Sequence, residues 1–242
     1  MSTLVVTGTG TGVGKTVVTA AIAAVLAARG RSVAVVKPAQ TGVGPGEPGD
    51  MDEVSRLCGL RNVHELSRYR LPLAPAAAAR LSGTAAVDLE VAAQTIRQLA
   101  AEHDSVLVEG AGGLLVRFDD DGRTIADLAH QLDAEVLVVT QPDLGTLNHT
   151  ALTLEAMAHR GLRLAGVVIG AWPANPDLAC RSNIRDLQTL AARPLAGALP
   201  AMAATTGSPT DFLQVAIAGL APALGGSFDA ADFESTYPPL ED

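Results

Sequence analysis

Residues 8–16 read GTGTGVGKT, running from Gly8 to Thr16. An apolar, strand-like run, Thr3–Thr7, precedes them, and an alanine-rich run that stops at Gly30 follows them. A strand, a glycine-rich loop ending in Lys-Thr and a helix, in this order, form the context in which such a loop binds phosphate groups. Small residues let the backbone curve around phosphate oxygens, so that successive N–H groups and the helix N-terminus point at the anion. The sequence therefore predicts a nucleoside triphosphate site close to the start of the chain.

The spacing within this loop departs from the common pattern of a glycine, four residues and Gly-Lys-Ser/Thr. Here five residues separate Gly8 from Gly14. The physical roles are unchanged, because Lys15 can reach the β- and γ-phosphates and the Thr16 hydroxyl can ligate Mg²⁺. A glycine-rich turn without a ligand is the alternative, and the order of the flanking elements disfavours it.

Short β-branched strands alternate with helices along the rest of the chain. This alternation predicts a single α/β domain over residues 1–242, with a mostly parallel sheet flanked by helices as in P-loop NTPases. The expected strands are Thr3–Thr7, Ser32–Lys37, Ser105–Glu109, Glu135–Thr140, Leu164–Gly170 and Pro194–Leu199. The expected helices are Thr16–Arg29, Asp50–Cys58, one opened by Pro75, Asp88–Ala101, one capped by Thr124, Thr146–Arg160, Asp177–Ala192 and Asp211–Ala218. Residues 38–49 are expected to form an irregular loop and residues 114–124 a hairpin-like excursion turning at Asp121-Gly122, while the tail after Ala201 has no clear assignment.

The composition narrows the classes of function. Hydrophobic residues make up 48% of the chain and aromatic residues 3%, which suits an aliphatic core around buried parallel strands. The net charge of −9 argues against partners such as nucleic acid or an anionic membrane surface. No apolar run reaches the roughly 18–20 residues needed to span a bilayer. The chain starts without a signal-like segment, and Cys58 and Cys180 fit neither a metal site nor a disulfide framework, so we expect a cytoplasmic protein.

Two lysines and two carboxylates are the candidates for chemistry. Of the 17 basic residues only Lys15 and Lys37 are lysines, and both end a strand–loop segment, where α/β proteins place their ligands. Glu109 stands at the end of a strand, in the position of an acidic metal ligand. Asp50 is a second candidate ligand, but capping of the helix that follows would explain an aspartate there equally well.

Four segments of the chain resemble the dethiobiotin synthetase family. They are Val6-Thr7-Gly8 through Lys15-Thr16, Lys37-Pro38-Ala39-Gln40-Thr41-Gly42, Val108-Glu109-Gly110-Ala111-Gly112-Gly113, and Asp143-Leu144-Gly145-Thr146-Leu147-Asn148-His149-Thr150. These motifs occur in the order and spacing of the family, over the chain to about residue 200. The phosphate loop with five intervening residues is itself typical of the family.

The resemblance implies an ATP-dependent ring closure late in biotin synthesis. One amine of 7,8-diaminononanoate takes up CO₂, supplied as bicarbonate, to give a carbamate. The carbamate oxygen then attacks the γ-phosphorus of ATP, and the second amine attacks the activated carbonyl. A cyclic urea, ADP and phosphate are the products.

The resemblance also implies roles for individual residues. Lys15 and Lys37 would be catalytic, stabilising charge on the γ-phosphoryl group and the carbamate. The expected ligands of Mg²⁺ are Thr16, Asp50 and Glu109, and the expected substrate contacts are Thr41, Ala111 and Gly112. The expected nucleotide contacts are Gly12, Val13, Gly14, Lys15, Thr16, Val17, Gly170 and Pro200.

Family members are homodimers with the substrate pocket at the subunit interface. The helix that begins at Thr146 would then bind the distal carboxylate of the partner's substrate through Leu147 and Asn148, because a helix N-terminus suits an anion. Gly170 departs from the family pattern, since many members have an asparagine there that reads adenine. We therefore expect weak discrimination among nucleoside triphosphates, with CTP or GTP accepted.

Three other interpretations remain in view. A partitioning-type regulatory ATPase has the same fold but usually carries an extra lysine early in the loop, which would fall near Gly10. A related amide-forming synthetase usually carries a glutaminase domain with a catalytic cysteine, for which this chain has no room. A nucleotide-binding module without chemistry is disfavoured by the two lysines and two carboxylates.

Overall fold

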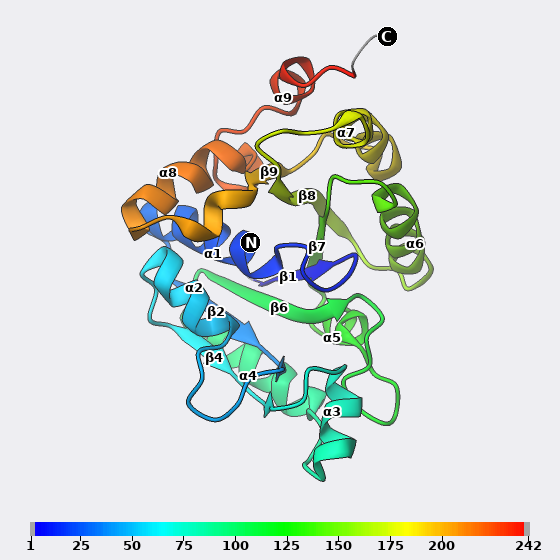
Figure 1. The fold of residues 1–242 in the computed structure, drawn as a ribbon. Helices are drawn as coiled ribbons and strands as arrows, with labels where there is room; N and C mark the ends of the chain where they lie inside the picture. Colours follow the sequence, from blue (N-terminus) through cyan, green and yellow to red (C-terminus); the bar gives the residue numbers. More distant parts are fainter. Residues whose placement is uncertain (1–2, 240–242) are drawn as a thin grey trace.

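A seven-stranded parallel sheet forms the centre of the molecule in the computed structural model, which describes residues 3–239 (Figure 1). Its strand order is β4-β2-β6-β1-β7-β8-β9, and every neighbouring pair is parallel. The strands are β1 (Thr3–Gly8), β2 (Val33–Lys37), β4 (Val63–Glu65), β6 (Ser105–Gly113), β7 (Glu135–Thr140), β8 (Leu164–Trp172) and β9 (Gly197–Pro200). Two further short strands, β3 (Gln40–Thr41) and β5 (Arg68–Tyr69), pair with each other beside the main sheet.

Helices cover both faces of this sheet (Figure 1). One face packs against α1 (Lys15–Ala28), α2 (Asp50–Cys58) and α8 (Pro209–Gly219). The other packs against α4 (Leu89–Glu102), α5 (Ile125–Gln131), α6 (Thr146–His159) and α7 (Leu178–Ala191). Helix α3 (Pro75–Ser82) and the C-terminal α9 (Ala230–Thr236) complete the chain, with 3₁₀ turns at Ala201–Thr205 and Pro222–Leu224. None of the helices between residues 3 and 239 combines the length and the apolar composition that crossing a bilayer requires.

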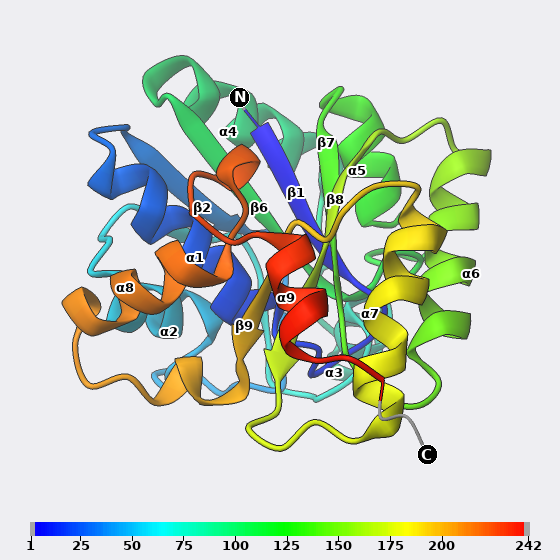
Figure 2. The ribbon, with the colours of Figure 1, turned by 90° about the horizontal axis from the view of Figure 1, so that it is seen from above.

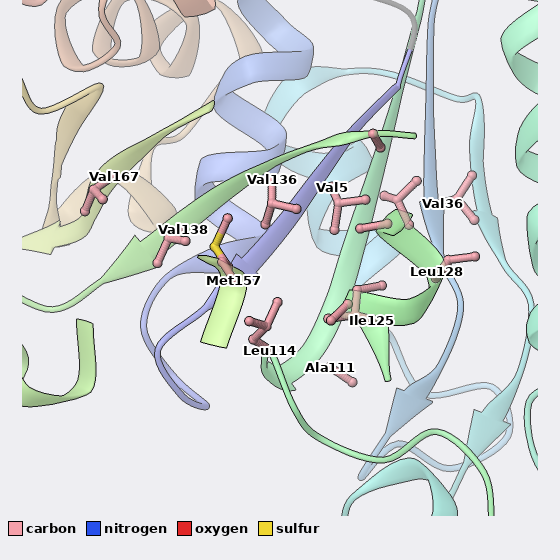
Figure 3. Packing of buried hydrophobic residues seen from close by; sticks show 14 of the residues in the cluster. Val5, Val36, Ala111, Leu114, Ile125, Leu128, Val136, Val138, Met157 and Val167 are labelled. Carbon is pink, nitrogen blue, oxygen red and sulfur yellow. The ribbon is translucent and has the colours of Figure 1, made fainter. Parts of the chain in front are cut away.

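The core is two aliphatic clusters separated by the sheet. In β1, Leu4 and Val6 contribute to the cluster under α1, and Val5 contributes to the opposite one. Figure 3 shows this second cluster, where Val5 and Val136 of the sheet face Ile125 of α5. Alternate side chains of a strand point to opposite faces, so a strand buried on both faces is apolar throughout.

The predicted elements are confirmed for most of the chain, with differences at particular points. The expected hairpin after Leu114 is reduced to one antiparallel bridge between Arg117 and Thr124, with the turn at Gly122, whose φ is 82°. The loop before Asp50 contains β3. Strand β6 continues four residues beyond the expected end at Glu109, and β8 continues two residues beyond the expected end at Gly170. Helix α9 had no counterpart in the sequence prediction.

The C-terminal tail, which contains α9, packs against the sheet through aromatic contacts. The Trp172 ring lies 4.9 Å from the Phe233 ring and 5.0 Å from that of Tyr237, centroid to centroid. Gln188 of α7 also donates a 2.7 Å hydrogen bond to Glu234 of α9. Figure 2 shows α9 packed beside α7 on the β9 side of the sheet. The tail, up to residue 239, is therefore packed against β8 and α7.

Candidate functional site

A cavity of about 780 Å³ lies where the strands β1, β2 and β6 end. Because all three strands are parallel, the loops that follow them meet at one edge of the sheet. The cavity brings together most of the predicted site residues, namely Gly12, Gly14, Lys15, Thr16, Val17, Lys37, Thr41, Asp50, Glu109, Ala111 and Gly112.

The phosphate loop passes from β1 directly into α1. Gly14 has a φ of 95°, in the left-handed region that favours glycine, and it stands immediately before the helix. A Cβ atom at Gly14 would also lie 2.7 Å from the carbonyl oxygen of Gly170. The loop therefore needs glycine at this point both for its turn and for its contact with β8.

Lys15 is folded back onto its own loop, since its Nζ donates a 2.8 Å hydrogen bond to the carbonyl oxygen of Gly10. Its side chain is buried, and burial, followed by the nearby Lys37 ammonium, lowers the pKa of Lys15 to about 8. Lys15 forms no ion pair with another described residue, and a buried, unpaired cation favours the arrival of an anion such as a phosphate group.

Lys37, at the end of β2, lies between the two predicted acidic ligands. Its Nζ is 2.5 Å from Asp50 Oδ2 and 2.7 Å from Glu109 Oε1, and it donates to the carbonyl oxygen of Gly110 at 3.2 Å. Burial lowers the pKa of Lys37, but the Glu109 and Asp50 carboxylates outweigh burial, and the net direction is upward. Lys37 therefore stays protonated at neutral and moderately alkaline pH, whereas Lys15, with its lower pKa, loses its proton as the pH rises through about 8.

Asp50 is the first residue of α2 and does not cap it, so the capping interpretation is wrong. The N-cap residue is Gly49, whose N–H donates to Asp52 Oδ2 at 2.7 Å. The N–H of Asp50 donates at 2.8 Å to the side-chain oxygen of Gln40. With the helix end satisfied by other groups, the Asp50 carboxylate is turned toward Lys37.

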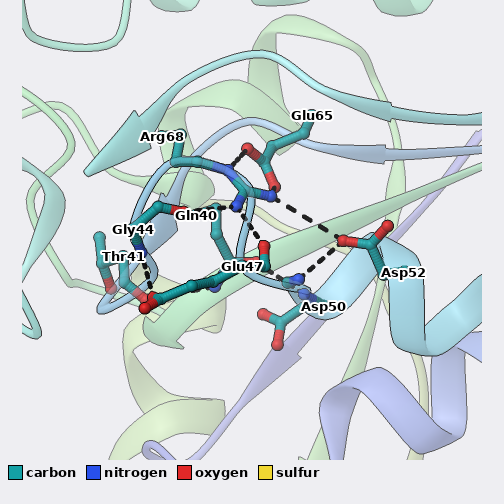
Figure 4. A network of polar contacts seen from close by, with 9 residues as sticks. Gln40, Thr41, Gly44, Glu47, Asp50, Asp52, Glu65 and Arg68 are labelled. Atoms are coloured by element: carbon teal, nitrogen blue, oxygen red, sulfur yellow. Dashed lines mark hydrogen bonds and ion pairs between the residues drawn. The ribbon is translucent and has the colours of Figure 1, made fainter. Parts of the chain in front are cut away.

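A polar network braces the loop that leads into Asp50 (Figure 4). Arg68 donates to the carbonyl oxygens of Gly44 and Glu47 at 3.1 and 2.6 Å. Its guanidinium is also held by both carboxylate oxygens of Glu65, at 2.5 and 2.9 Å. A bidentate guanidinium–carboxylate pair has a defined geometry, so Arg68 holds this loop against β5 and thereby orients the start of α2.

Thr16 and Glu109 are also joined, because the Thr16 hydroxyl donates to Glu109 Oε1 at 2.9 Å. Glu109 is 1% exposed, and among the described residues its other oxygen, Oε2, has no hydrogen-bond partner. A buried carboxylate oxygen without a partner is costly unless a ligand completes it. These hydroxyl and carboxylate oxygens fit Mg²⁺, which prefers oxygen ligands and keeps positions for phosphate and water. Within residues 3–239 no cluster of three or more His, Cys, Asp or Glu side chains forms a separate metal site.

Five predicted site residues lie outside this cavity. Val13 is buried in the core beneath the loop, and Gly170 packs against its backbone. Pro200 ends β9 opposite Trp172. Leu147 packs against the core and Asn148 is exposed, both in the first turn of α6.

The structure adds residues that the sequence did not predict. Gln40 is buried and holds the backbone of Asp50. Residues 72–75 form one wall of the cavity. The only sequence signal in that wall is Pro75 as a helix start, whereas Gln40 lies inside the motif that carries the family resemblance and had no assigned role.

This chain is similar in sequence to a known protein family and to several curated relatives. A family described as an AAA domain matches residues 2–208. The ATP-dependent dethiobiotin synthetase BioD of Frankia casuarinae is 65% identical over 237 residues, which cover 98% of this chain and 99% of that protein. The BioD of Streptomyces avermitilis is 57% identical and covers 99% of this chain and 100% of that protein.

Solved structures with a similar fold are more distant in sequence. The cell division ATPase MinD of Pyrococcus furiosus has a TM-score of 0.54 at 20% identity, covering 89% of this chain and 97% of its own. A ParA family ATPase from Chlorobium tepidum has a TM-score of 0.53 at 17% identity, covering 96% of this chain and 98% of its own. At this level of identity the likeness concerns the fold, which is that of P-loop NTPases.

Proposed function

The chain belongs to the ATP-dependent dethiobiotin synthetase family, and we propose that its 780 Å³ cavity is where the cyclic urea is formed. The enzyme is an ATP-dependent ligase that closes a ring through C–N bonds. The observation that carries the assignment of this cavity is the convergence of Lys15, Lys37, Asp50 and Glu109 at one edge of the sheet.

The reaction starts from 7,8-diaminononanoate and CO₂. One neutral amine attacks CO₂, a C–N bond forms, the nitrogen loses a proton, and a carbamate results. The Lys37 ammonium lies at the end of β2 facing the cavity, where it can stabilise the carbamate oxygens. The Thr41 hydroxyl and the backbone groups of Ala111 and Gly112 line the same cavity and would position the diamine.

Phosphoryl transfer follows at the phosphate loop. The carbamate oxygen attacks the γ-phosphorus, the bond to the β-phosphate oxygen breaks, and ADP leaves. Lys15 would move from the Gly10 carbonyl to the γ-phosphoryl oxygens, where its charge offsets the charge that develops in the transition state. Gly12, Val13, Gly14, Thr16 and Val17 would surround the phosphates, with Gly170 and Pro200 toward the base.

Ring closure completes the sequence. The second amine attacks the carbonyl carbon, the C–O bond to phosphate breaks, the nitrogen loses its proton, and phosphate leaves. Holding both amines and the activated carbonyl in one closed geometry is the main catalytic contribution of such a site.

Thr16, Asp50 and Glu109 would hold Mg²⁺. The unpartnered oxygen of Glu109 supports this assignment, as does the shared contact of Thr16 and Asp50 with the Lys37–Glu109 pair. When bound, the ion would neutralise charge on the β- and γ-phosphates.

We further propose a homodimer in which the first turn of α6 serves the partner's site. The exposed Asn148 and the 90% exposed Leu144 support a surface that another chain covers. Leu147 and Asn148 would then bind the distal carboxylate of the partner's diamine at a helix N-terminus. The two free cysteines, Cys58 and Cys180, suit a reducing cytoplasmic location.

A partitioning-type regulatory ATPase shares the fold but is not favoured. Position 10 is glycine where such proteins usually carry their extra lysine, and the high identity to BioD proteins spans nearly the whole chain. The deciding experiment incubates the protein with 7,8-diaminononanoate, bicarbonate, ATP and Mg²⁺ and follows the product by mass spectrometry. We expect a cyclic urea that requires both bicarbonate and ATP. ATP hydrolysis without a urea product would refute the proposal.

A further inference from the structure

Four threonine hydroxyls meet where the phosphate loop, β7 and α6 come together. Thr140 Oγ1, at the end of β7, lies 2.7 Å from Thr146 Oγ1 and 2.9 Å from Thr150 Oγ1, both on α6. It also lies 3.3 Å from Thr9 Oγ1 in the phosphate loop. Thr140 and Thr150 are 0% exposed and Thr146 is 4% exposed, so water does not compete for the contacts among these three hydroxyls, whereas Thr9 is half-buried.

The number of protons sets the direction of each hydrogen bond. A hydroxyl donates one proton and accepts at two lone pairs. Thr146 donates its proton to the carbonyl oxygen of Gln141 at 2.5 Å, so the proton of Thr140 must go to Thr146. Thr9 and Thr150 then donate to Thr140. One side chain thus uses its full hydrogen-bonding capacity to join three elements.

We propose that Thr140 is a positioning residue that fixes the first turn of α6 relative to the phosphate loop. This inference rests on the proposed function, in which that turn binds the distal carboxylate of the diamine. If each α6 serves the partner's site, Thr140 also joins the nucleotide site of one subunit to the substrate site of the other.

Loss of the Thr140 hydroxyl affects the phosphate loop and helix α6 unequally. The phosphate loop has a second attachment to β7, because the N–H of Thr9 donates to the carbonyl oxygen of Val139 at 3.0 Å. Its contact with Thr140 is also the longest of the three. Helix α6 has the two shorter contacts, through Thr146 in its first turn and Thr150 in its second, so a change at Thr140 disturbs the diamine site more than the nucleotide site.

The test compares three variants by steady-state kinetics with each substrate varied in turn. Thr140→Val keeps the shape of the side chain but removes the hydroxyl, and Thr140→Ser keeps the hydroxyl. Thr19→Val is the matched control, because Thr19 is an equally buried threonine whose hydroxyl has no hydrogen-bond partner among the described residues. Two lost hydrogen bonds at about 1 kcal/mol each correspond to an increase of about 30-fold in the KM for the diamine in Thr140→Val. The KM for ATP should stay within about twofold of the unmodified enzyme.

The outcomes separate this inference from the proposed function. Rescue of the diamine KM in Thr140→Ser, with no change in Thr19→Val, supports a positioning role. An unchanged diamine KM in Thr140→Val, or an equal change in Thr19→Val, overturns it while leaving the proposed function intact. If Thr140→Val does not fold, as judged by circular dichroism, Thr150→Val decides with a smaller expected rise of about fivefold, and no rise overturns the inference. A missing urea product from the unmodified enzyme contradicts the proposed function instead.

Discussion

Lys37 and Glu109 form a buried ion pair. Nζ and Oε1 are 2.7 Å apart, and the two side chains are 4% and 0% exposed. The pair joins the end of β2 to the middle of β6, its neighbour in the sheet. Removing one partner of such a pair leaves an uncompensated charge in the interior, so the pair matters to folding as well as to chemistry.

Glu109→Gln should therefore destabilise the protein. We expect the free energy of unfolding to fall by about 3 kcal/mol, the lower end for a broken buried pair, because Lys37 keeps its contact with Asp50. Urea denaturation gives the value. Glu53→Gln is the matched control, since Glu53 pairs with Arg56 on the surface, and its loss should cost at most about 0.5 kcal/mol. Equal stability of the two variants would contradict a buried pair.

Lys37→Gln should separate binding from catalysis. The glutamine keeps a hydrogen-bonding side chain but loses the charge that the carbamate and γ-phosphoryl group require, so kcat should fall by at least about 10²–10³-fold. Nucleotide affinity, measured by calorimetry, should change only a few-fold, because the phosphate loop and Lys15 remain. Near-normal turnover would show that Lys37 has another role.

Strand patterns allowed most of the sheet to be predicted. Glu135–Thr140 has the predicted bounds, since a β-branched run buried on both faces has few other solutions. The strand pattern also predicted that Lys37 and Glu109 lie close together, because neighbouring parallel strands run toward the same edge of the sheet, although β6 continues past Glu109 to Gly113. Both predictions depend on the local hydrophobic pattern of each strand and on the parallel topology that this pattern implies.

The missed features depend on contacts between distant parts of the chain. Helix α9 is held by Trp172 and α7, and no local pattern in the tail contains those contacts. The role of Asp50 could not be decided locally because two other residues, Gln40 and Asp52, satisfy the start of α2. The cavity wall at residues 72–75 joins the site through the pairing of β3 with β5, whose short strands give little sequence signal.

Lys15 predicts a pH dependence of nucleotide use. Burial and the Lys37 ammonium lower its pKa from 10.5 to about 8, so the free enzyme loses this charge as the pH rises through about 8. With saturating diamine, kcat/KM for ATP should fall above that pH. Because the unfolded chain binds more protons than the folded one between about 8 and 10.5, this group makes stability rise with pH in the same window.

Lys15→Arg is the control for this assignment. A guanidinium stays protonated over the whole range, so the residual activity of the variant should lack the fall near pH 8. Parallel pH profiles of kcat/KM for ATP in both enzymes would show that another group titrates.

Gly170 should not tolerate a side chain. A Cβ there would overlap the carbonyl oxygen of Val13 and lie 2.6 Å from Val139 Cγ1. Gly170→Ala should push the phosphate loop outward, destabilise the protein by about 1–3 kcal/mol as overpacking does, and raise the KM for ATP. Gly207→Ala is the control, because a Cβ at Gly207 meets no atom within 4 Å. Equal thermal stability of Gly170→Ala and the unmodified protein would contradict this close packing.

The same contact predicts weak discrimination among nucleotide bases. Residue 170 has no side-chain amide and its backbone lies against Val13, so no side chain reaches from this point to a base. Sites that hydrogen-bond a substrate group reject analogues lacking it by 10⁴-fold or more, whereas a site without such groups cannot. We therefore expect kcat/KM values for ATP, CTP and GTP within about tenfold of one another, measured as urea product by mass spectrometry. A preference for ATP above about 10³-fold would mean that other groups read the base and that the glycine at position 170 is irrelevant to nucleotide choice.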